Sequence, residues 1–194
     1  MIAARGAAKR YGRKRVLGPV DLVVPTGGFA IVTGPNGSGK TTLLRLLAGL
    51  AAPSSGTVVV DVDRSRIGYL AHEPLVYREL TGLENLDLYG RLYRVSERRE
   101  RIGMLLERFG LWEARGARVA TYSRGMAQRL ALCRALLHEP DLVLLDEPYS
   151  ALDATGASLL DRELRSLSDA STLVVATHDP ERLSALATTR LALT

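Results

Sequence analysis

The sequence holds a single cysteine, Cys133, so the chain cannot form an internal disulfide. A lone thiol fits a reducing compartment, and because Cys133 stands in an apolar segment we expect it to be a small buried side chain on a helix. Long apolar runs are also missing. The longest, such as LVLL and TLVVA, are far shorter than the ~20 residues that a membrane-spanning helix needs. The N-terminal MIAARGAAKRYGRK has no continuous apolar region behind its charges, so no signal peptide is predicted.

Lysine and the side-chain amides are nearly absent as well. Of the 26 basic residues, the only lysines are Lys9, Lys14 and Lys40. The only amides are Asn36, Asn85 and Gln128. A residue type that is rare in the chain can therefore mark a position where the function requires it. The net charge of +5 is spread along the chain, which indicates solvated faces, so no nucleic-acid partner is expected.

Strand and helix patterns alternate along most of the chain. Residues 15–28 predict short strands broken by glycine and proline. Further strands are expected at residues 28–34, 57–62, 66–71, 141–148 and 171–178. Helices are expected at residues 40–50, 84–110, 124–140, 155–168 and 179–187, the last with Asp179 as N-cap and Pro180 at its first position. This alternation favours right-handed βαβ crossovers and a mostly parallel core sheet, with a β-rich N-terminal third and a helical middle as subdomains.

The segment GPNGSGKT, residues 34–41, follows a predicted strand and opens a predicted helix, which is the context that a phosphate-binding P-loop requires. Glycines let the backbone bend so that successive N–H groups face phosphate oxygens, and the helix start adds its positive dipole end. Lys40 is expected to bind the β- and γ-phosphates of ATP and to act in catalysis, and the Thr41 hydroxyl to bind Mg²⁺. The residues predicted to contact the nucleotide here are Gly34, Pro35, Asn36, Gly37, Ser38, Gly39, Lys40, Thr41 and Thr42.

The apolar segment LVLLDEP ends in two adjacent acids, Asp146 and Glu147. Acids at the end of a buried strand are unfavourable unless a cation or a functional site uses them. Asp146 is expected to reach Mg²⁺, and Glu147 to polarise the attacking water as general base. A solvent-exposed strand end is the simpler alternative.

In this order, the segments resemble the ATPases of ABC transporters over nearly the whole chain. YSRGMAQRL is similar to the signature segment of that family, SALD at 150–153 to its D-loop, and VVATHD to the strand end that carries its switch histidine, here His178. Tyr11 lies where the family stacks an aromatic ring on adenine. The resemblance implies an α/β, ABC-type P-loop fold with a mostly parallel core sheet, an N-terminal antiparallel β subdomain and a helical subdomain. It implies one domain, residues 1–194, with the Q-loop and helical subdomain at about 72–138.

The resemblance also implies a mechanism. Two copies would dimerise head to tail, with each ATP held between one phosphate loop and Ser123 and Gly125 of the other copy, and Asp153 would link the two sites. His178 would hydrogen-bond the γ-phosphate and the attacking water. Closure on ATP and release after hydrolysis would drive an integral membrane subunit from the cytoplasmic face of the inner membrane.

The signature segment departs from the family pattern at two positions. Arg124 takes its first glycine slot, and Met126 replaces its glutamine. Ser123 and Gly125, the groups that must approach the phosphate, are retained, so we expect function to survive.

The segment IGYLAHEP ends an alternating apolar stretch in a histidine, His72, just before Pro74. In most of the family this position is a glutamine that touches Mg²⁺ and the attacking water. We expect His72 to take that place as a metal-site residue, although nitrogen is a poor Mg²⁺ ligand and a strand-end histidine can simply cap backbone groups. His72, Pro74 and ELTGLENL resemble the ATPase subunits of the cytochrome c maturation haem exporters, the CcmA group, in which Ala71 is typically glycine.

We therefore expect the ATPase subunit of an ABC transporter, most like those that export haem. Candidates for docking a helix of the membrane subunit, or for ordinary core between subdomains, are Leu75, Val76, Tyr77 and Leu80. Three alternatives stay open. They are the ATPase of a transporter for drugs, lipids or ions, a soluble ABC ATPase of translation or DNA repair, and a P-loop metabolic kinase, which would need neither the signature segment nor His178.

Overall fold

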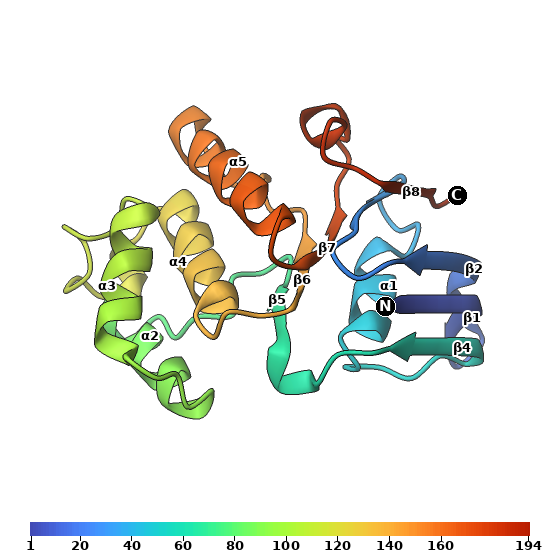
Figure 1. Ribbon diagram of the computed structural model, residues 1–194, viewed down its shortest axis with the longest axis horizontal. Coiled ribbons are helices and arrows are strands. Elements are labelled where there is room, and N and C mark those ends of the chain that lie inside the picture. The colour runs from blue at the N-terminus through green and yellow to red at the C-terminus, as the bar shows by residue number, and fades with distance from the viewer.

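A five-stranded parallel sheet runs through the middle of the molecule in the computed structural model, which describes all 194 residues (Figure 1). Its strands, in spatial order, are β5 (Ile67–Leu70), β6 (Leu142–Asp146), β7 (Thr172–Ala176), β3 (Phe29–Thr33) and β8 (Thr189–Ala192). Every residue of β6 and β7 is buried, which explains why these strands are continuous apolar runs. The predicted α/β class with a parallel core sheet is confirmed.

The two faces of this sheet carry two separate apolar clusters, because successive strand residues point to opposite faces. On one face, Val143 and Leu145 of β6 join a cluster with α4 (Arg124–Leu136) and α5 (Ala154–Ser168). On the other face, Leu142 and Leu144 join a cluster with α1 (Lys40–Leu47) and the N-terminal strands. The sheet is thus covered on both sides, as an α/β core requires.

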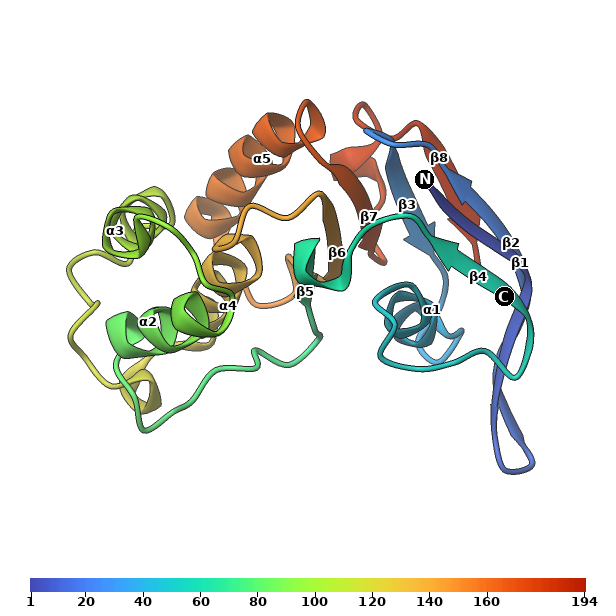
Figure 2. The same cartoon turned by 60° about the horizontal axis from the view of Figure 1, so that its bottom comes forward.

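A second, antiparallel sheet packs over α1, with strand order β2-β1-β4 (Figure 2). Its strands are β1 (Ile2–Tyr11), β2 (Lys14–Val24) and β4 (Ser55–Val60). The prediction of short, broken strands at residues 15–28 is wrong, since β2 is continuous through Gly18 and Pro19. The reason is its place at the sheet edge with a register shift near Pro19, where a missing N–H donor is tolerated.

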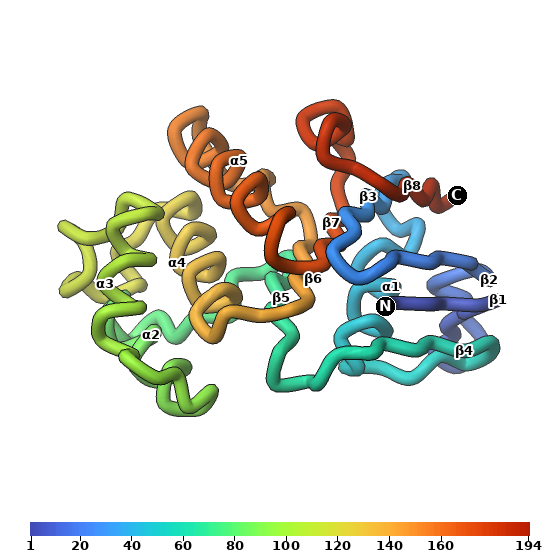
Figure 3. The backbone as a smooth tube through the Cα atoms, viewed as in Figure 1, coloured from blue at the N-terminus to red at the C-terminus, as the bar shows by residue number.

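Residues 71–141 leave the parallel sheet at β5 and return in its neighbour β6 (Figure 3). They form α2 (Gly82–Leu92), α3 (Arg98–Arg108) and α4, which lie together at the end of the molecule opposite the antiparallel sheet. The single helical stretch predicted for residues 84–110 is therefore divided in two. The break lies where Arg94 and Glu97 adopt left-handed backbone conformations, which a continuous helix excludes.

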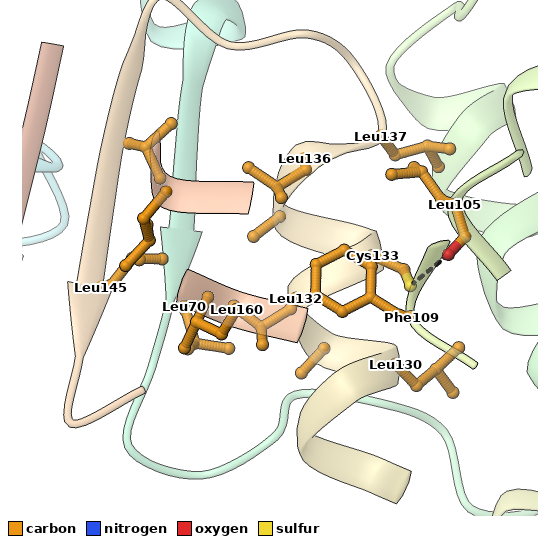
Figure 4. Packing of buried hydrophobic residues seen from close by; sticks show 14 of the residues in the cluster. Leu70, Leu105, Phe109, Leu130, Leu132, Cys133, Leu136, Leu137, Leu145 and Leu160 are labelled. Atoms are coloured by element: carbon orange, nitrogen blue, oxygen red, sulfur yellow. Dashed lines mark hydrogen bonds between the residues drawn. The ribbon is translucent and has the colours of Figure 1, made fainter. Parts of the chain in front are cut away.

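The larger apolar cluster joins these helices to the parallel sheet (Figure 4). Cys133 lies within it on α4, fully buried, with its Sγ 3.6 Å from the carbonyl oxygen of Leu105 on α3. Burial raises the pKa of this thiol far above its ordinary value. The predicted role of Cys133 as a small core side chain is confirmed.

The helix predicted for residues 179–187 is not formed. Only one 3₁₀ turn, Glu181–Leu183, is present, with Pro180 rather than Asp179 as its N-cap. The Asp179 N–H instead donates to the Thr177 hydroxyl at 3.0 Å. The chain then has only a few residues before β8 pairs with β3, so a full helix does not fit this connection.

His138 follows α4 and makes the stability of the fold depend on pH. It is 8% exposed, its Nε2 lies 3.2 Å from the carbonyl oxygen of Ile67, and its ring stacks on Tyr93 at 4.0 Å. Burial lowers the pKa of His138 below its ordinary 6.5. As pH falls below that value, the unfolded chain binds a proton that the folded chain does not, so the free energy of unfolding falls.

We predict that acid from about pH 7 to about pH 5 destabilises the protein through His138, with a slope of at most about 1.4 kcal/mol per pH unit from this residue. Urea unfolding at a series of pH values measures it. His138→Gln should flatten the dependence. The same slope in His138→Gln and in the parent would contradict the assignment.

Candidate nucleotide site

The loop between β3 and α1 is built on glycines that no other residue can replace. Gly39 has φ +102°, and a Cβ there would lie 2.7 Å from the carbonyl oxygen of Val16. Gly34 has φ +149°, and a Cβ there would lie 2.6 Å from the carbonyl oxygen of Leu193. The loop therefore packs against its neighbours by backbone alone and leads directly into α1 at Lys40. A helix start of this kind presents its free N–H groups to an anion.

Lys40 is a buried cation, with only 7% of its side chain exposed. Its Nζ donates to the carbonyl oxygens of Gly34 at 2.7 Å and Pro35 at 3.3 Å. It also lies 3.5 Å from Oε1 of Glu147. The ammonium is thus fixed inside the loop and beside one of the two predicted acids, where it suits a phosphate group.

Thr41 and Asp146 form the part of the site that fits a divalent cation. The Thr41 hydroxyl donates to Oδ2 of Asp146 at 2.6 Å, and Asp146 is 1% exposed. The other oxygen, Oδ1, is buried without a hydrogen-bond partner. Burial raises the pKa of Asp146, while the Thr41 hydrogen bond opposes the shift. A hydroxyl beside an unpaired buried carboxylate oxygen matches the oxygen ligands that Mg²⁺ prefers.

Glu147 is held in an unusual backbone conformation. Its φ is +49°, and its N–H donates to the carbonyl oxygen of Ala176 at 2.9 Å, across from β6 to β7. Its Oε2 lies 2.8 Å from Nδ1 of His178 and accepts from the His178 N–H at 3.3 Å. Because a carboxylate only accepts, Nδ1 carries the hydrogen in this contact. Left-handed non-glycine residues cluster at functional sites, where the surrounding structure compensates their strain.

These groups share one pocket of about 380 Å³ at the carboxyl ends of the parallel strands. His72, which is exposed and lies two residues beyond the end of β5, also lines it. The residues that line the pocket are Lys14, Val16, Asn36, Gly37, Gly39, Lys40, Thr41, Thr42, His72, Asp146 and Glu147. Phosphate-loop residues, both acids and His72 are thus brought together.

Lys14 and Val16 are pocket residues that the motifs did not indicate. Both lie on β2, and Lys14 pairs with Tyr11 across the β1–β2 turn. The sequence offered one indication of Lys14, the scarcity of lysine, since Lys14 is one of only three lysines in the chain. Tyr11 itself is 53% exposed, with the Lys9 ammonium 5.0 Å from its ring centre.

Ser123 and Gly125 do not line this pocket. Ser123 caps α4, its Oγ accepting from the Met126 N–H at 3.2 Å. Gly125 stands so close to the chain at Ala151 that a Cβ would lie 3.0 Å from that carbonyl oxygen. Ser123 and Arg124 are exposed. The predicted nucleotide ligands therefore form two separate groups within one chain.

The fold and the pocket define a P-loop ATP-binding domain of the α/β class. More specifically, the chain belongs to the ABC transporter family, whose sequence pattern matches residues 17–150. The ABC ATPase fold of the sequence analysis is confirmed. Membership of this family implies that the domain binds and hydrolyses ATP.

Characterised and uncharacterised relatives agree with this assignment. The chain is 41% identical over 184 residues to the uncharacterized ABC transporter ATP-binding protein YxlF of Bacillus subtilis, and 42% identical over 187 residues to the daunorubicin resistance ATP-binding protein DrrA3 of Streptomyces coeruleorubidus. These matches cover 92% and 91% of the chain but only 62% and 59% of the relatives. The ABC transporter ATP-binding protein NatA of Bacillus subtilis is 34% identical, with 96% of the chain and 82% of NatA covered. The chain thus spans about three fifths of the length of the first two relatives.

Solved structures show the same fold. The ATP-binding cassette MJ0796, described as a dimer in a post-hydrolysis state bound to ADP and Pi, superposes with a TM-score of 0.89 at 29% identity. The match covers 100% of the chain and 94% of that structure. A second dimeric structure of MJ0796, described as a bacterial ABC transporter cassette, gives a TM-score of 0.89 at 30% identity.

Replacing Glu147 by glutamine should separate binding from turnover. The amide keeps the shape of the side chain but cannot accept a proton from the attacking water, so we expect ATP hydrolysis to fall at least about 100-fold while ATP binding is retained. Phosphate release and nucleotide titration measure the two quantities. Glu139→Gln is the matched control, because Glu139 also has a left-handed backbone but pairs with Arg101. Hydrolysis at the parental rate in Glu147→Gln would remove Glu147 from the role of base.

Proposed function

We propose that the chain is the ATP-hydrolysing subunit of an ABC transporter and that two copies close head to tail on ATP to drive a membrane subunit. The proposal rests on one observation: the residues predicted to bind the nucleotide form two separate groups. Lys40, Thr41, Asp146 and Glu147 converge in one pocket. Ser123 and Gly125 stand apart from it at the start of α4. Ser123 is exposed there, so a second copy can bring it to the phosphate.

In this proposal, each residue of the pocket has a distinct task. The glycine-lined loop, Pro35, Ser38 and Thr42 surround the phosphates, and Lys40 donates to the β- and γ-phosphates. Thr41 and Asp146 hold Mg²⁺, which when bound neutralises charge on the phosphate oxygens. Glu147 takes the proton of the attacking water, and His178 orients Glu147 through the 2.8 Å contact at Nδ1. His72 accepts a hydrogen bond from the attacking water near the metal.

The adenine end of ATP is assigned to the β1–β2 turn. Tyr11 is the predicted stacking residue, and its exposed ring is available to a base. Lys14, its partner across the turn, lines the phosphate pocket. Because these two residues lie side by side on the turn, one nucleotide can meet the ring at one end and the ammonium at the other.

Closure of two copies is supported by the dimeric descriptions of the MJ0796 structures. The helix α4 begins at Ser123 and has no acid in its first turn, so its positive dipole end is unopposed. Asp153, the predicted link between the two sites, caps α5 through a 2.8 Å bond from the Gly156 N–H. Both helix starts are therefore rigidly formed before a second copy arrives.

The dimer is tested with the hydrolysis-deficient Glu147→Gln variant. With ATP and Mg²⁺ it should elute at twice the subunit mass, and without ATP at the mass of one copy. Adding Ser123→Glu places a carboxylate against the γ-phosphate and should abolish the dimer while each copy still binds ATP. Ser158→Glu, on the exposed face of α5, is the control that should still dimerise. A dimer that survives Ser123→Glu would contradict the proposed arrangement.

We assign residues 72–138 the task of contacting the membrane subunit. None of the helices combines the length and apolar character that crossing a bilayer requires. Leu75 and Tyr77 are 51% and 53% exposed, whereas Val76 packs against the larger apolar cluster. Exposed apolar side chains between the nucleotide pocket and α2 favour docking over ordinary core for Leu75 and Tyr77. The proposed location is peripheral, at the cytoplasmic face of the inner membrane.

The cargo has two candidate classes, each with its own support. Haem export in cytochrome c maturation rests on His72, Pro74 and the ELTGLENL segment. Drug export rests on the relatives, since DrrA3 and DrrA, the latter of Streptomyces peucetius, are both described as daunorubicin resistance proteins and match over 91% of the chain. The matches to these relatives cover more of the chain than the short segment does, which favours drug export over haem export. A relative named for sulfate and thiosulfate import, CysA of Mycolicibacterium paratuberculosis, is equally similar, at 41% identity over 92% of the chain.

Removing the gene from its native host separates the two classes. Haem export predicts loss of haem-stained c-type cytochromes with unchanged tolerance of amphipathic drugs. Drug export predicts normal cytochromes and a several-fold lower growth-inhibiting concentration of an anthracycline. Restoring the parent gene should reverse the defect, and restoring Glu147→Gln should not. Loss of neither property would exclude both cargo classes while leaving the ATPase assignment in place.

A further inference from the structure

Arg134, near the end of α4, is a buried arginine without a carboxylate partner. It is 7% exposed, and no carboxylate oxygen lies within 4.0 Å of its guanidinium nitrogens, the distance that defines an ion pair. Its Nη2 donates to the carbonyl oxygen of Tyr69 on β5 at 2.8 Å, and its Nε is buried with no partner. A buried charge without an opposite charge is unfavourable, so its other contacts must compensate.

The second contact of Arg134 is the aromatic ring of Tyr89 on α2. The guanidinium carbon lies 5.3 Å from the ring centre, within the range of a cation–π interaction. The Tyr89 hydroxyl donates in turn to the carbonyl oxygen of Leu75 at 3.1 Å. Burial raises the pKa of Tyr89, so its hydroxyl remains a donor at neutral pH.

Tyr69 and Leu75 stand on either side of the segment that carries His72. Tyr69 belongs to β5, three residues before His72, and Leu75 follows three residues after it. His72 itself lines the nucleotide pocket. One side-chain pair, Arg134 with Tyr89, therefore holds both ends of a short segment whose central residue, His72, is exposed and lines the nucleotide pocket.

Asn85, one turn before Tyr89 on α2, also binds the segment that follows His72. It is fully buried, and its side chain bonds both the N–H of Tyr77 at 2.8 Å and the carbonyl oxygen of Tyr77 at 2.9 Å. The segment after His72 is thus bound to α2 at two points, whereas the segment before it is bound to α4. A displacement of α2 relative to α4 would therefore act on the segment that carries His72.

We infer that Arg134 is a positioning residue that, with Tyr89, fixes His72 at the nucleotide pocket and joins it to α2 and to the helix that begins at Ser123. The inference rests on the proposed ATPase function and deepens it, because it names the side chains that connect the predicted membrane-contacting segment to the phosphates. An arginine is needed, since one N–H bonds a carbonyl while the delocalised charge lies over a ring.

Tyr89→Phe and Arg134→Lys test the inference. The first removes only the hydroxyl bond to Leu75, and the second keeps the charge but loses the planar group. Each should lower kcat for ATP about fivefold, the loss expected for one hydrogen bond that acts in the transition state, with ATP affinity unchanged. Tyr89→Phe should leave the melting temperature unchanged, whereas Arg134→Lys should lower it, because a buried charge loses its compensating contacts. Arg101→Lys is the control, because it removes an equivalent bond to the carbonyl oxygen of Leu136. Its kcat should equal that of the parent.

A double-mutant cycle with His72→Ala distinguishes positioning from general support. If Arg134 and Tyr89 act through His72, adding Tyr89→Phe to His72→Ala should lower kcat no further. An additional fivefold loss in that background would overturn the inference. So would a fall in melting temperature and ATP affinity that accounts for the whole loss of activity in the single variants.

Amide hydrogen exchange gives a readout that does not need hydrolysis. Tyr89→Phe and Arg134→Lys should speed exchange severalfold at the Tyr77 amide, which donates to Asn85 at 2.8 Å, and leave the phosphate loop unchanged. Unchanged exchange at the Tyr77 amide would overturn the inference even in an active enzyme. A parent protein that does not hydrolyse ATP, but shows the expected exchange, would instead contradict the proposed function and leave the attachment of the segment standing.

Discussion

Two contacts join the head of α1 to the carboxyl end of β6, and the nucleotide site depends on both. The Thr41 hydroxyl meets Asp146 at 2.6 Å, and the Lys40 ammonium lies 3.5 Å from Glu147. The start of α1 supplies the donors, and the end of β6 with the residue after it supplies the acids. Because β3 and β6 are parallel members of the same sheet, separated by β7, their carboxyl ends meet at one edge. The phosphate loop and the acids are brought together there, although more than a hundred residues separate them in the chain.

The same sheet edge explains the separate place of Ser123. The helix α4 belongs to the segment between β5 and β6, and the residues at its start do not line the pocket that their own chain forms. Under the proposed function, a chain built in this way carries one half of a nucleotide site in its core and the other half on an exposed helix start. Two copies related head to tail would then complete both sites at once, with ATP as the bridging ligand. The proposed attachment of His72 to α2 and α4 would link this pocket residue to the helices.

Much of the core could be predicted from the sequence, because its strands are short apolar runs bounded by glycine, proline or acids. The phosphate loop and the Asp-Glu pair were located by their motifs, and the structure places those residues in one pocket. The failures have physical causes. β1 is rich in alanine and arginine, and its strand conformation depends on pairing with β2 and β4 rather than on its own pattern. The break after α2 depends on left-handed residues, and nothing in their residue types indicates that conformation.

Contacts between distant segments could not be predicted at all. Arg134 and Tyr69 are 65 positions apart, and their bond exists only because α4 packs beside β5. Lys14 enters the pocket because β2 passes behind Gly39, where the missing side chain allows close approach. Sequence motifs indicate the residues proposed to contact the phosphates, whereas the residues that hold them in place emerge only from the packing.

The central claim is that a triphosphate bridges the loop at Lys40 of one copy and the helix start at Ser123 of another. The most direct test is a structure of the Glu147→Gln variant with ATP and Mg²⁺. The account predicts two copies related by a twofold axis, each γ-phosphate within hydrogen-bond distance of the Ser123 hydroxyl of the partner copy. A single copy with bound ATP, or a pair whose phosphates lie far from Ser123, would contradict it.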